Sequence, residues 1–239
     1  MGKQVYVELP VRAPMERLWE LTQDPSCHPR WDLRFTAIVP APGTSPQEFR
    51  YEFRLPLHTI HGTGTSLGTR TGQHGQATSV LKFTTRDVLS PIGPGAGYWR
   101  YIPGPDGVRF ITGYDYSPGW GTLGRWLDAP LIRPALGWAT AWSFDRLRLW
   151  AEDGIAPERA RRAWLLDAGL RSAALAGSAA LLLRGRGTAS FLAAAAAAAA
   201  ALLAPPAGSV PRAANCRRSA PDRHASRPPA SLAALPEPA

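Results

Sequence analysis

Residues 107–150 read GVRFITGYDYSPGWGTLGRWLDAPLIRPALGWATAWSFDRLRLW, and the hydrophobic period changes within this stretch. In residues 108–116, apolar and aromatic side chains alternate with Arg109 and Asp115, which predicts a half-buried β-strand. In residues 123–150, apolar side chains recur every three or four positions, which predicts a helix. A curved sheet with one wet face needs its other face covered, and this helix is the element large enough to cover it.

The expected apolar stripe of the long helix consists of large side chains, namely Leu127, Leu131, Trp138, Trp142 and Leu149. Pro130 and Pro134 should kink or divide its first half, because proline removes a backbone donor and clashes with the preceding turn. We expect Trp31, Trp138 and Trp142 to be buried.

The residues that precede this stretch complete the sheet. Residues 5–9 alternate as a strand, and Ala13-Pro14 opens a short amphipathic helix. Residues 48–55 show the cleanest alternation in the chain, and turns at 91–97 and 103–107 separate consecutive strands. The pattern predicts an α+β fold, in which a curved antiparallel β-sheet wraps around a long C-terminal α-helix.

The composition changes near Gly154 and predicts three regions. Eight of the nine Trp, all six Tyr and six of the seven Phe lie before residue 151. Residues 1–153 carry a net charge of +2 and residues 154–239 one of +7. We expect a folded domain in residues 1–153, an Ala-rich apolar helical segment in 154–205, and a disordered Pro/Arg/Ser-rich tail in 206–239.

The order of elements resembles the SRPBCC superfamily, which includes START, polyketide cyclase/dehydrase and lipid-transport-like domains. The stretch VELPVRAPMERLWELTQDPSCHPRWD (residues 7–32) is similar to the family's opening strand, its helix start and its "DP..HP.W" segment, and residues 107–150 are similar to its closing strand and long helix. The resemblance implies a helix-grip fold over about residues 3–152. The chain also resembles, more narrowly, uncharacterised bacterial members with a membrane-associated C-terminal extension.

Aromatic side chains on the inward faces indicate a cavity between sheet and helix, because many wide rings are hard to pack without a gap. The candidate ligand-binding residues are Tyr51, Phe53, Phe83, Trp99, Tyr101, Phe110, Thr112, Tyr114, Tyr116, Trp138 and Trp142. We expect a hydrophobic small molecule or lipid to bind there. The alternatives are a cyclase, aromatase or hydratase acting on a polyketide-like or aromatic substrate in the same cavity, and a solid packed core.

No catalytic residue, cofactor or metal site is predicted. His58, His61 and His74 lie in a Gly/Thr-rich segment without a nearby ligand cluster, so they are expected to be solvated loop residues. Cys27-His28 is interpreted as structural. A third candidate, Asp115, is expected to pair across strands with a basic residue such as Arg100.

The apolar segment indicates membrane association. Residues 163–183 are apolar except for Asp167 and Arg171, which are spaced to pair along a helix, and residues 188–204 add a second, marginally short stretch. Residues 163–204 are thus expected to form a helical hairpin that either spans the membrane or lies on its surface, with RGRG as the turn.

The positive charge lies in the tail rather than on the fold, which speaks against a nucleic-acid partner. Residues 1–20 lack the apolar core of a signal peptide, and only two cysteines are present. We therefore expect a cytoplasmic domain associated with the inner (plasma) membrane.

Overall fold

The computed structural model describes residues 4–70, 72, 75–185 and 187–238, and the chain divides into two compact units. The first unit comprises Met1–Gly154 together with Arg212–Ala239, and the second comprises Ile155–Pro211. The chain therefore leaves the first unit at the end of its long helix and returns to it after the second unit.

A seven-stranded antiparallel sheet forms the centre of the first unit, with the strand order β1-β7-β6-β5-β4-β3-β2. Its strands are β1 (Val5–Val11), β2 (Ala37–Pro40), β3 (Gln47–Arg54), β4 (Thr59–Thr69), β5 (Ala77–Thr84), β6 (Ile92–Gly104) and β7 (Gly107–Pro118). The first strand pairs with the last, as Leu9 opposite Phe110 shows. The first and last strands of the chain are therefore neighbours in the sheet.

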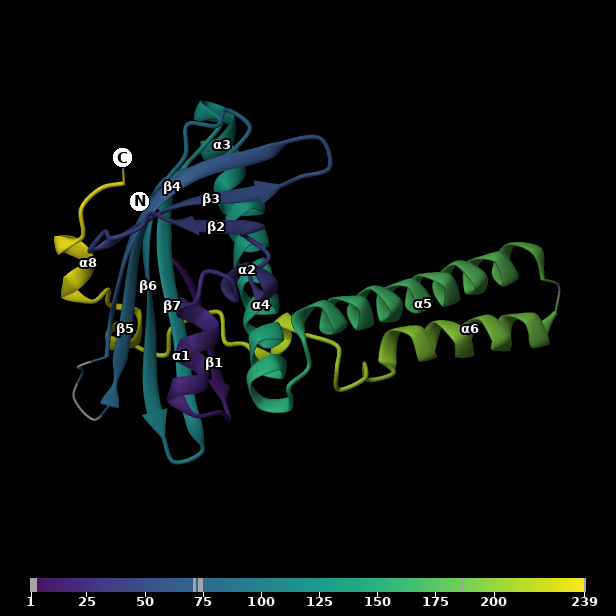
Figure 1. The fold of residues 1–239 in the computed structure, drawn as a ribbon. Coiled ribbons are helices and arrows are strands. Elements are labelled where there is room, and N and C mark those ends of the chain that lie inside the picture. Colours follow the sequence, from purple (N-terminus) through teal and green to yellow (C-terminus); the bar gives the residue numbers. More distant parts are fainter. Residues whose placement is uncertain (1–3, 71, 73–74, 186, 239) are drawn as a thin grey trace. The chain divides into compact units, whose positions relative to one another are not determined.

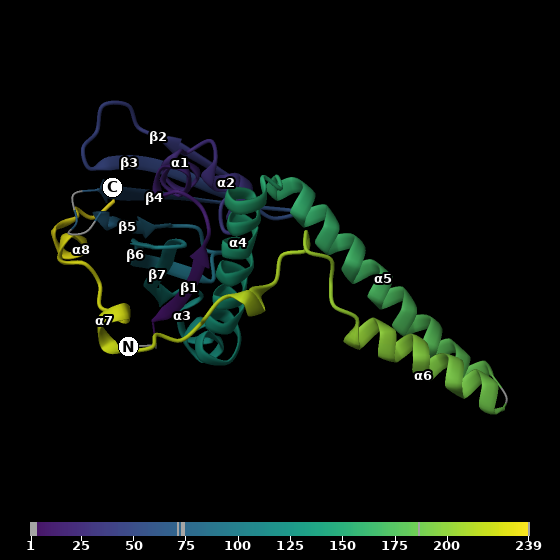
Figure 2. The ribbon, with the colours of Figure 1, turned by 90° about the horizontal axis from the view of Figure 1, so that it is seen from below.

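Helices connect and cover the strands. Between β1 and β2 lie α1 (Met15–Gln23) and α2 (His28–Trp31); after β7 come α3 (Gly121–Leu127), the π-helical turn η2 (Asp128–Ile132) and α4 (Arg133–Asp153). Figures 1 and 2 show α4 against one face of the sheet, which we call the concave face. The strand order and the position of α4 confirm the predicted helix-grip fold.

The core lies between the concave face and α4. Phe110 of β7 stacks on Phe144 of α4 with ring centroids 4.6 Å apart, and Trp31 of α2 packs edge-on against Phe144. The side chains of Val7 and Leu9 on β1 belong to the same cluster. Strand alternation thus directs one apolar row of β1 and one of β7 onto the helix.

The long helix differs from its predicted phase. The two prolines do divide it, since α3 ends before η2 and α4 begins at Arg133. Trp31 and Trp142 are buried as predicted, but the prediction is wrong for Trp138, which is 40% exposed. The sheet-facing row of α4 instead includes Thr140, Phe144 and Leu147, because these three side chains lie one helical turn apart on the side of β7.

The C-terminal tail also differs from its predicted disorder. It contains η3 (Ala213–Asn215), α7 (Arg223–Ser226) and α8 (Ala230–Ala234), and Figure 1 shows α8 on the side of the sheet opposite α4. Ala225 and Leu235 pack there against sheet residues, namely Tyr6, Val80, Tyr98 and Ile111. The opposite, convex face carries large apolar side chains too, and the tail removes them from water.

Polar contacts hold the tail in place. Glu8 and Arg217 exchange two backbone hydrogen bonds of 2.9 Å, and Tyr98 Oη donates to the carbonyl of Ala225 at 3.1 Å. The buried carboxylate of Asp145 on α4 accepts hydrogen bonds from the backbone of Arg212 at 2.7 Å and from Asn215 at 3.0 Å. We refer to residues 212–238 as the tail strap.

The second unit is an antiparallel pair of helices, α5 (Pro157–Arg184) and α6 (Thr188–Leu203). The predicted Asp167–Arg171 pair forms at 2.8 Å, and the same guanidinium donates to the carbonyls of Ala201 and Ala204 at the end of α6. Of the helices in the described part of the chain, α5 is long and apolar enough to cross a membrane by length and composition. Most of its side chains and those of α6 face outward.

Candidate functional site

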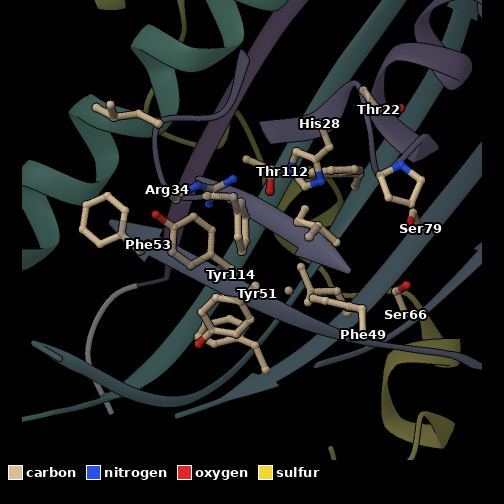
Figure 3. Close-up of a pocket in the computed structure, with 18 of the residues that line it drawn as sticks. Thr22, His28, Arg34, Phe49, Tyr51, Phe53, Ser66, Ser79, Thr112 and Tyr114 are labelled. Carbon is tan, nitrogen blue, oxygen red and sulfur yellow. The ribbon is translucent and has the colours of Figure 1, made fainter. Parts of the chain in front are cut away.

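A cavity of about 270 Å³ lies between the concave face of the sheet, the α1–α2 segment and α4. Most of its lining side chains are apolar, including Phe35, Ile38, Phe49, Tyr51, Phe53, Ile60, Leu81, Phe83, Trp99 and Leu136. They come from β2 to β6, from α4 and, in the case of Phe35, from the segment between α2 and β2. Figure 3 shows the rings of Phe49, Tyr51 and Phe53 at the wall of this space.

The Gly-rich sequence of β4 explains how the rings fit. Phe49 and Tyr51 of β3 lie opposite Gly64 and Gly62 of β4. A Cβ atom at Gly62 would lie 2.2 Å from the Tyr51 ring, and one at Gly64 would lie 2.4 Å from the Phe49 ring. The two aromatic rings therefore lie flat over neighbouring glycines, which leaves space above them.

Six of the eleven predicted ligand-binding residues line this cavity. They are Tyr51, Phe53, Phe83, Trp99, Thr112 and Tyr114. They occupy four strands, β3, β5, β6 and β7, and all six are on the concave face. Alternation along the strands was sufficient to place them there.

The other five predicted residues lie elsewhere. Tyr101 is fully buried beneath α1, where its hydroxyl bonds to Thr22 at 2.7 Å, and Phe110 fills the core against α4. Tyr116 donates to Asp128 at 2.6 Å near the other end of β7. The last two, Trp138 and Trp142, stack on each other along α4, 6.2 Å apart, away from the cavity.

A buried polar cluster forms one part of the wall, and the sequence did not single it out. The Arg34 guanidinium makes a two-point contact with Asp32, with Nε–Oδ1 at 2.9 Å and Nη2–Oδ2 at 2.6 Å. His28 Nε2 lies 3.1 Å from the second oxygen of the same carboxylate. Asp32 is fully buried, whereas Arg34 and His28 line the cavity.

The environment fixes the charges in this cluster. Burial lowers the pKa of His28 and outweighs the opposing effect of Asp32, so that the imidazole is neutral near pH 7. Burial acts to raise the pKa of Asp32, but the Arg34 charge and the hydrogen bonds from His28 and Arg34 hold it well below its usual range. Arg34 stays charged beside that carboxylate.

Tyrosines lie next to this cluster. The Arg34 guanidinium carbon is 5.1 Å from the centroid of the Tyr114 ring, and the Tyr114 hydroxyl bonds to Thr140 of α4 at 2.9 Å. Burial raises the pKa of Tyr51 to about 12, so its phenol keeps its proton at neutral pH. Figure 3 shows Arg34, Tyr51 and Tyr114 close together at the same part of the wall.

The remaining candidates have structural partners. His58 pairs with Asp87 at 2.7 Å, and His61 lies 3.9 Å from Glu52, while His74 lies outside the described residues. No group of three or more potential metal ligands occurs among the residues that the structure describes. Asp115 was predicted to pair with a residue such as Arg100 but instead contacts Arg133 at 2.7 Å, because its register partner on β6 is Ala96.

Sequence reasoning missed the cavity residues supplied by the segment between α2 and β2. Arg34 follows a short helix and is not part of a periodic stretch, so neither alternation nor helical spacing predicts its direction. The HPRWD segment could have indicated the polar cluster. A histidine and an aspartate four residues apart on one helical turn face the same side, so their side chains are expected to meet.

The sequence is similar to that of a bacterial protein of unknown activity, although no family model matches it. The chain is 44% identical over 161 residues to the uncharacterized membrane protein YndG of Bacillus subtilis (strain 168), a match covering 66% of this chain and 60% of that protein. The chain thus spans about 60% of the length of this curated relative.

Solved structures with a similar backbone include a STAR-related lipid transfer protein fragment from Xanthomonas axonopodis. It is 18% identical to this chain with a TM-score of 0.48, and the match covers 61% of this chain and 83% of that chain. The protein TTHA0849 from Thermus thermophilus has 14% identity, a TM-score of 0.46, and coverage of 62% of this chain and 99% of that chain. Similarity at this level carries no information about ligand or reaction. The helix-grip assignment follows from the strand order and the position of α4.

Proposed function

We propose that this protein binds a hydrophobic small molecule or lipid in the cavity between sheet and α4, and that it does so at a membrane. The observation that carries the proposal is the cavity itself, a space of about 270 Å³ surrounded mainly by apolar and aromatic side chains. Such a wall favours an apolar molecule, because burying apolar surface is the main source of binding free energy there.

The size of the cavity limits the ligand. Pockets for small molecules measure roughly 300–1,000 Å³, and at about 270 Å³ this cavity lies just below that range. The space suits a compact ring system or one acyl segment. A whole two-chain lipid would need the walls to move apart.

The polar cluster suggests that the ligand has one polar end. Asp32 occupies two of the five N–H groups of Arg34 and Tyr114 is a further hydrogen-bond partner, which leaves up to two donors on a charged guanidinium at the cavity wall. A carboxylate, phenolate or carbonyl oxygen on the ligand would accept from them. The proposed ligand is therefore an apolar molecule with a single acceptor group.

The membrane part of the proposal rests on α5 and α6. Only 6% of the 18-residue apolar window of α5 is buried, so most of its apolar side chains would need another partner to leave water. A pair of helices with outward apolar side chains is suited to a bilayer, where every backbone group is satisfied within the helix. We assign residues 163–204 to contact with the membrane, and the relative's name as a membrane protein agrees with this assignment.

Native mass spectrometry of the full-length protein, released from its membrane in mild detergent, tests the proposal directly. We expect a co-purified apolar molecule, displaced by the anionic apolar probe 1-anilinonaphthalene-8-sulfonate with one saturable site. Thr112→Trp should abolish probe binding, because Thr112 lines the cavity and an indole would fill it.

Thr78→Trp is the matched control. Thr78 lies on the same sheet but on the convex side, in register with Arg100, and this variant should bind the probe as the unmodified protein does. Unsaturable probe binding, or equal binding by the two tryptophan variants, would contradict a ligand site in the cavity.

A second candidate function, an enzyme of the cyclase, aromatase or hydratase kind, is favoured by the His28–Asp32 pair. If His28 Nε2 donates to Asp32, the neutral ring retains a basic Nδ1 beside the cavity. That nitrogen would take a proton from carbon next to a substrate carbonyl, and Arg34 would stabilise the negative oxygen that forms.

Deuterium exchange separates the two candidates. The full-length protein is incubated in heavy water with an aromatic ketone of polyketide type, and exchange next to the carbonyl is followed by NMR. An enzyme loses exchange in His28→Gln but keeps probe binding. A binding protein shows no protein-dependent exchange with either form.

A further inference from the structure

One end of the first unit exposes large apolar side chains next to the cavity. They come from the β3–β4 loop, the β5–β6 loop and the α3 region, and we call them the apolar tip: Leu57, Val88, Leu89, Trp120, Leu123 and Trp126. Leu57 is fully exposed at 101% and Trp126 is 74% exposed. Single exposed apolar residues are ordinary, but a cluster of this kind marks an interaction surface.

Hydrogen bonds hold the three segments of the tip together. His58 and Asp87 join the β3–β4 loop to the β5–β6 loop at 2.7 Å, and Gly119 N donates to Pro91 O at 2.9 Å, which joins the β5–β6 loop to the start of α3. Figure 1 shows α3 and the β3–β4 loop toward the same end of the sheet. Ser90 and Pro91 of the middle segment also line the cavity, so the tip and the cavity share a wall.

The backbone of Trp120, one of the exposed tryptophans, adopts a conformation that is unfavourable for a residue other than glycine. Trp120 has a φ of +53°, in the left-handed region that residues other than glycine rarely occupy, and it precedes Gly121 with a φ of +56°. Its side chain is nevertheless 43% exposed. Asparagine or glycine would adopt this conformation more easily, so an exposed indole is not explained by the turn itself.

Two of the three segments of the tip also carry an exposed arginine. Arg86 and Arg125 are exposed and have no carboxylate partner among the described residues. The acidic groups of these segments contact other side chains, Asp87 that of His58, Glu52 that of Arg54, and Asp128 that of Arg133. A surface that combines exposed apolar side chains with exposed arginines is complementary to an anionic bilayer.

We propose that the apolar tip docks on the surface of an anionic bilayer, with Trp126 and Leu57 reaching among the lipid headgroups. Tryptophan favours this interface because its ring is apolar and its N–H is polar. Docking would hold the Ser90–Pro91 wall of the cavity against the lipid. This contact is separate from that assigned to residues 163–204, and it would align the cavity with the membrane from which an apolar ligand enters.

The test places a reporter at the tip of the full-length protein. An environment-sensitive nitrobenzoxadiazole dye is attached at Leu57→Cys in a Cys27→Ser background, where the remaining Cys216 is buried. The protein is reconstituted into vesicles of phosphatidylcholine with phosphatidylglycerol, or of phosphatidylcholine alone. The matched control carries the dye at Asp106→Cys, in the exposed β6–β7 turn at the other end of the sheet.

The expected result is a blue-shifted, brighter emission from position 57 in the anionic vesicles and an unchanged emission from position 106. Arg86→Gln and Arg125→Gln should each lower the ratio of docked to undocked tip about fivefold, as expected for one cation at an anionic surface. Trp126→Ser should remove the shift but leave binding of the cavity probe unchanged, since Trp126 does not line the cavity.

Three outcomes would overturn the proposal. Equal emission changes at both positions would show that the bilayer contacts the unit without preference for the tip, and no change at either would show that the tip stays in water. A shift at position 57 that grows with protein concentration without vesicles would assign the tip to a second copy of the chain. Loss of probe binding with an intact emission shift would instead contradict the proposed ligand site alone.

Discussion

At the scale of single residues, the most informative group is the fully buried Asp32. It holds Arg34 and His28 together beside the cavity, and it ties the α2–β2 segment into the wall. Arg34 N also donates to its carboxylate at 3.0 Å. Removing this carboxylate would leave a charged guanidinium and an imidazole without their partner, so Asp32 positions the polar part of the site.

The buried imidazole predicts how stability depends on pH. Because burial lowers the pKa of His28 in the folded state, the unfolded chain takes up a proton first when the pH falls through about 6.5. The free energy of unfolding should therefore decrease below that pH until the folded-state pKa is reached. Urea unfolding of the full-length protein between pH 7.5 and pH 5 measures this decrease, with these pH values chosen around the ordinary histidine pKa of about 6.5.

His28→Gln should reduce the pH dependence, because glutamine still donates to Asp32 but does not titrate. An unchanged acid-side loss of stability in His28→Gln would contradict its assignment to His28.

The two faces of α4 give a second residue-scale prediction. Phe144→Ala should lower the free energy of unfolding by about 3–5 kcal/mol, since Phe144 is fully buried against Phe110 and Trp31. Trp138→Ala should cost much less, about 1 kcal/mol, because the ring is partly exposed and stacks on Trp142 along the helix. Chemical denaturation followed by circular dichroism compares the two, and equal losses would mean that Trp138 also faces the core.

At the scale of elements, the strands were easier to predict than the helix phase. Alternation from Phe49 to Phe53 and from Phe110 to Tyr114 has a period of two, which fixes the face of each side chain once the sheet is known. The phase of α4 was harder because Trp138, Trp142, Phe144 and Leu147 are all large and apolar. A helix with apolar side chains on several sides does not show which side meets the sheet.

The candidate site was predictable only in part for a similar reason. The six candidate residues that line the cavity lie on regular strands, whereas Arg34 and Phe35 lie in an irregular segment whose direction depends on tertiary contacts. The tail strap was missed because its composition resembles a disordered segment. Its apolar anchors, Ala225 and Leu235, are few, and they are ordered by contact with the sheet.

The contacts of the tail strap predict that truncating one of its buried side chains lowers the stability of the protein. Leu235→Ala should lower the free energy of unfolding by about 2–3 kcal/mol, because the side chain is 3% exposed against the convex face. Ala234→Ser, at the exposed last position of α8 next to Leu235, should change it by less than about 0.5 kcal/mol. Thermal unfolding of the two full-length variants tests this, and a neutral effect of Leu235→Ala would mean that the strap does not stay on the sheet in solution.

At the scale of the whole molecule, the two units are expected to have separable roles. Both ends of the helical pair connect to the first unit, one through α4 and the other through the strap held by Asp145. From Asp145 to the end of α4 at Gly154 is about 14 Å of helix. A flexible Gly/Ser linker of about 12 residues has a mean span of roughly 20 Å, so it could replace Ile155–Pro211 without pulling the strap away.

That replacement separates folding from membrane association. The linker variant should keep a cooperative thermal transition and bind the cavity probe, because the sheet, α4 and the strap are all retained. It should no longer behave as an integral membrane protein, so that high salt or alkaline carbonate extracts it from membranes. The full-length protein should stay with the membrane because of its exposed apolar helices.

A further variant that ends at Asp153 also lacks the strap. Its Asp145 carboxylate has lost Arg212 and Asn215 as partners, and its convex face is open to water. It should unfold at a lower temperature than the linker variant, and equal transitions would show that the first unit does not depend on residues 212–238.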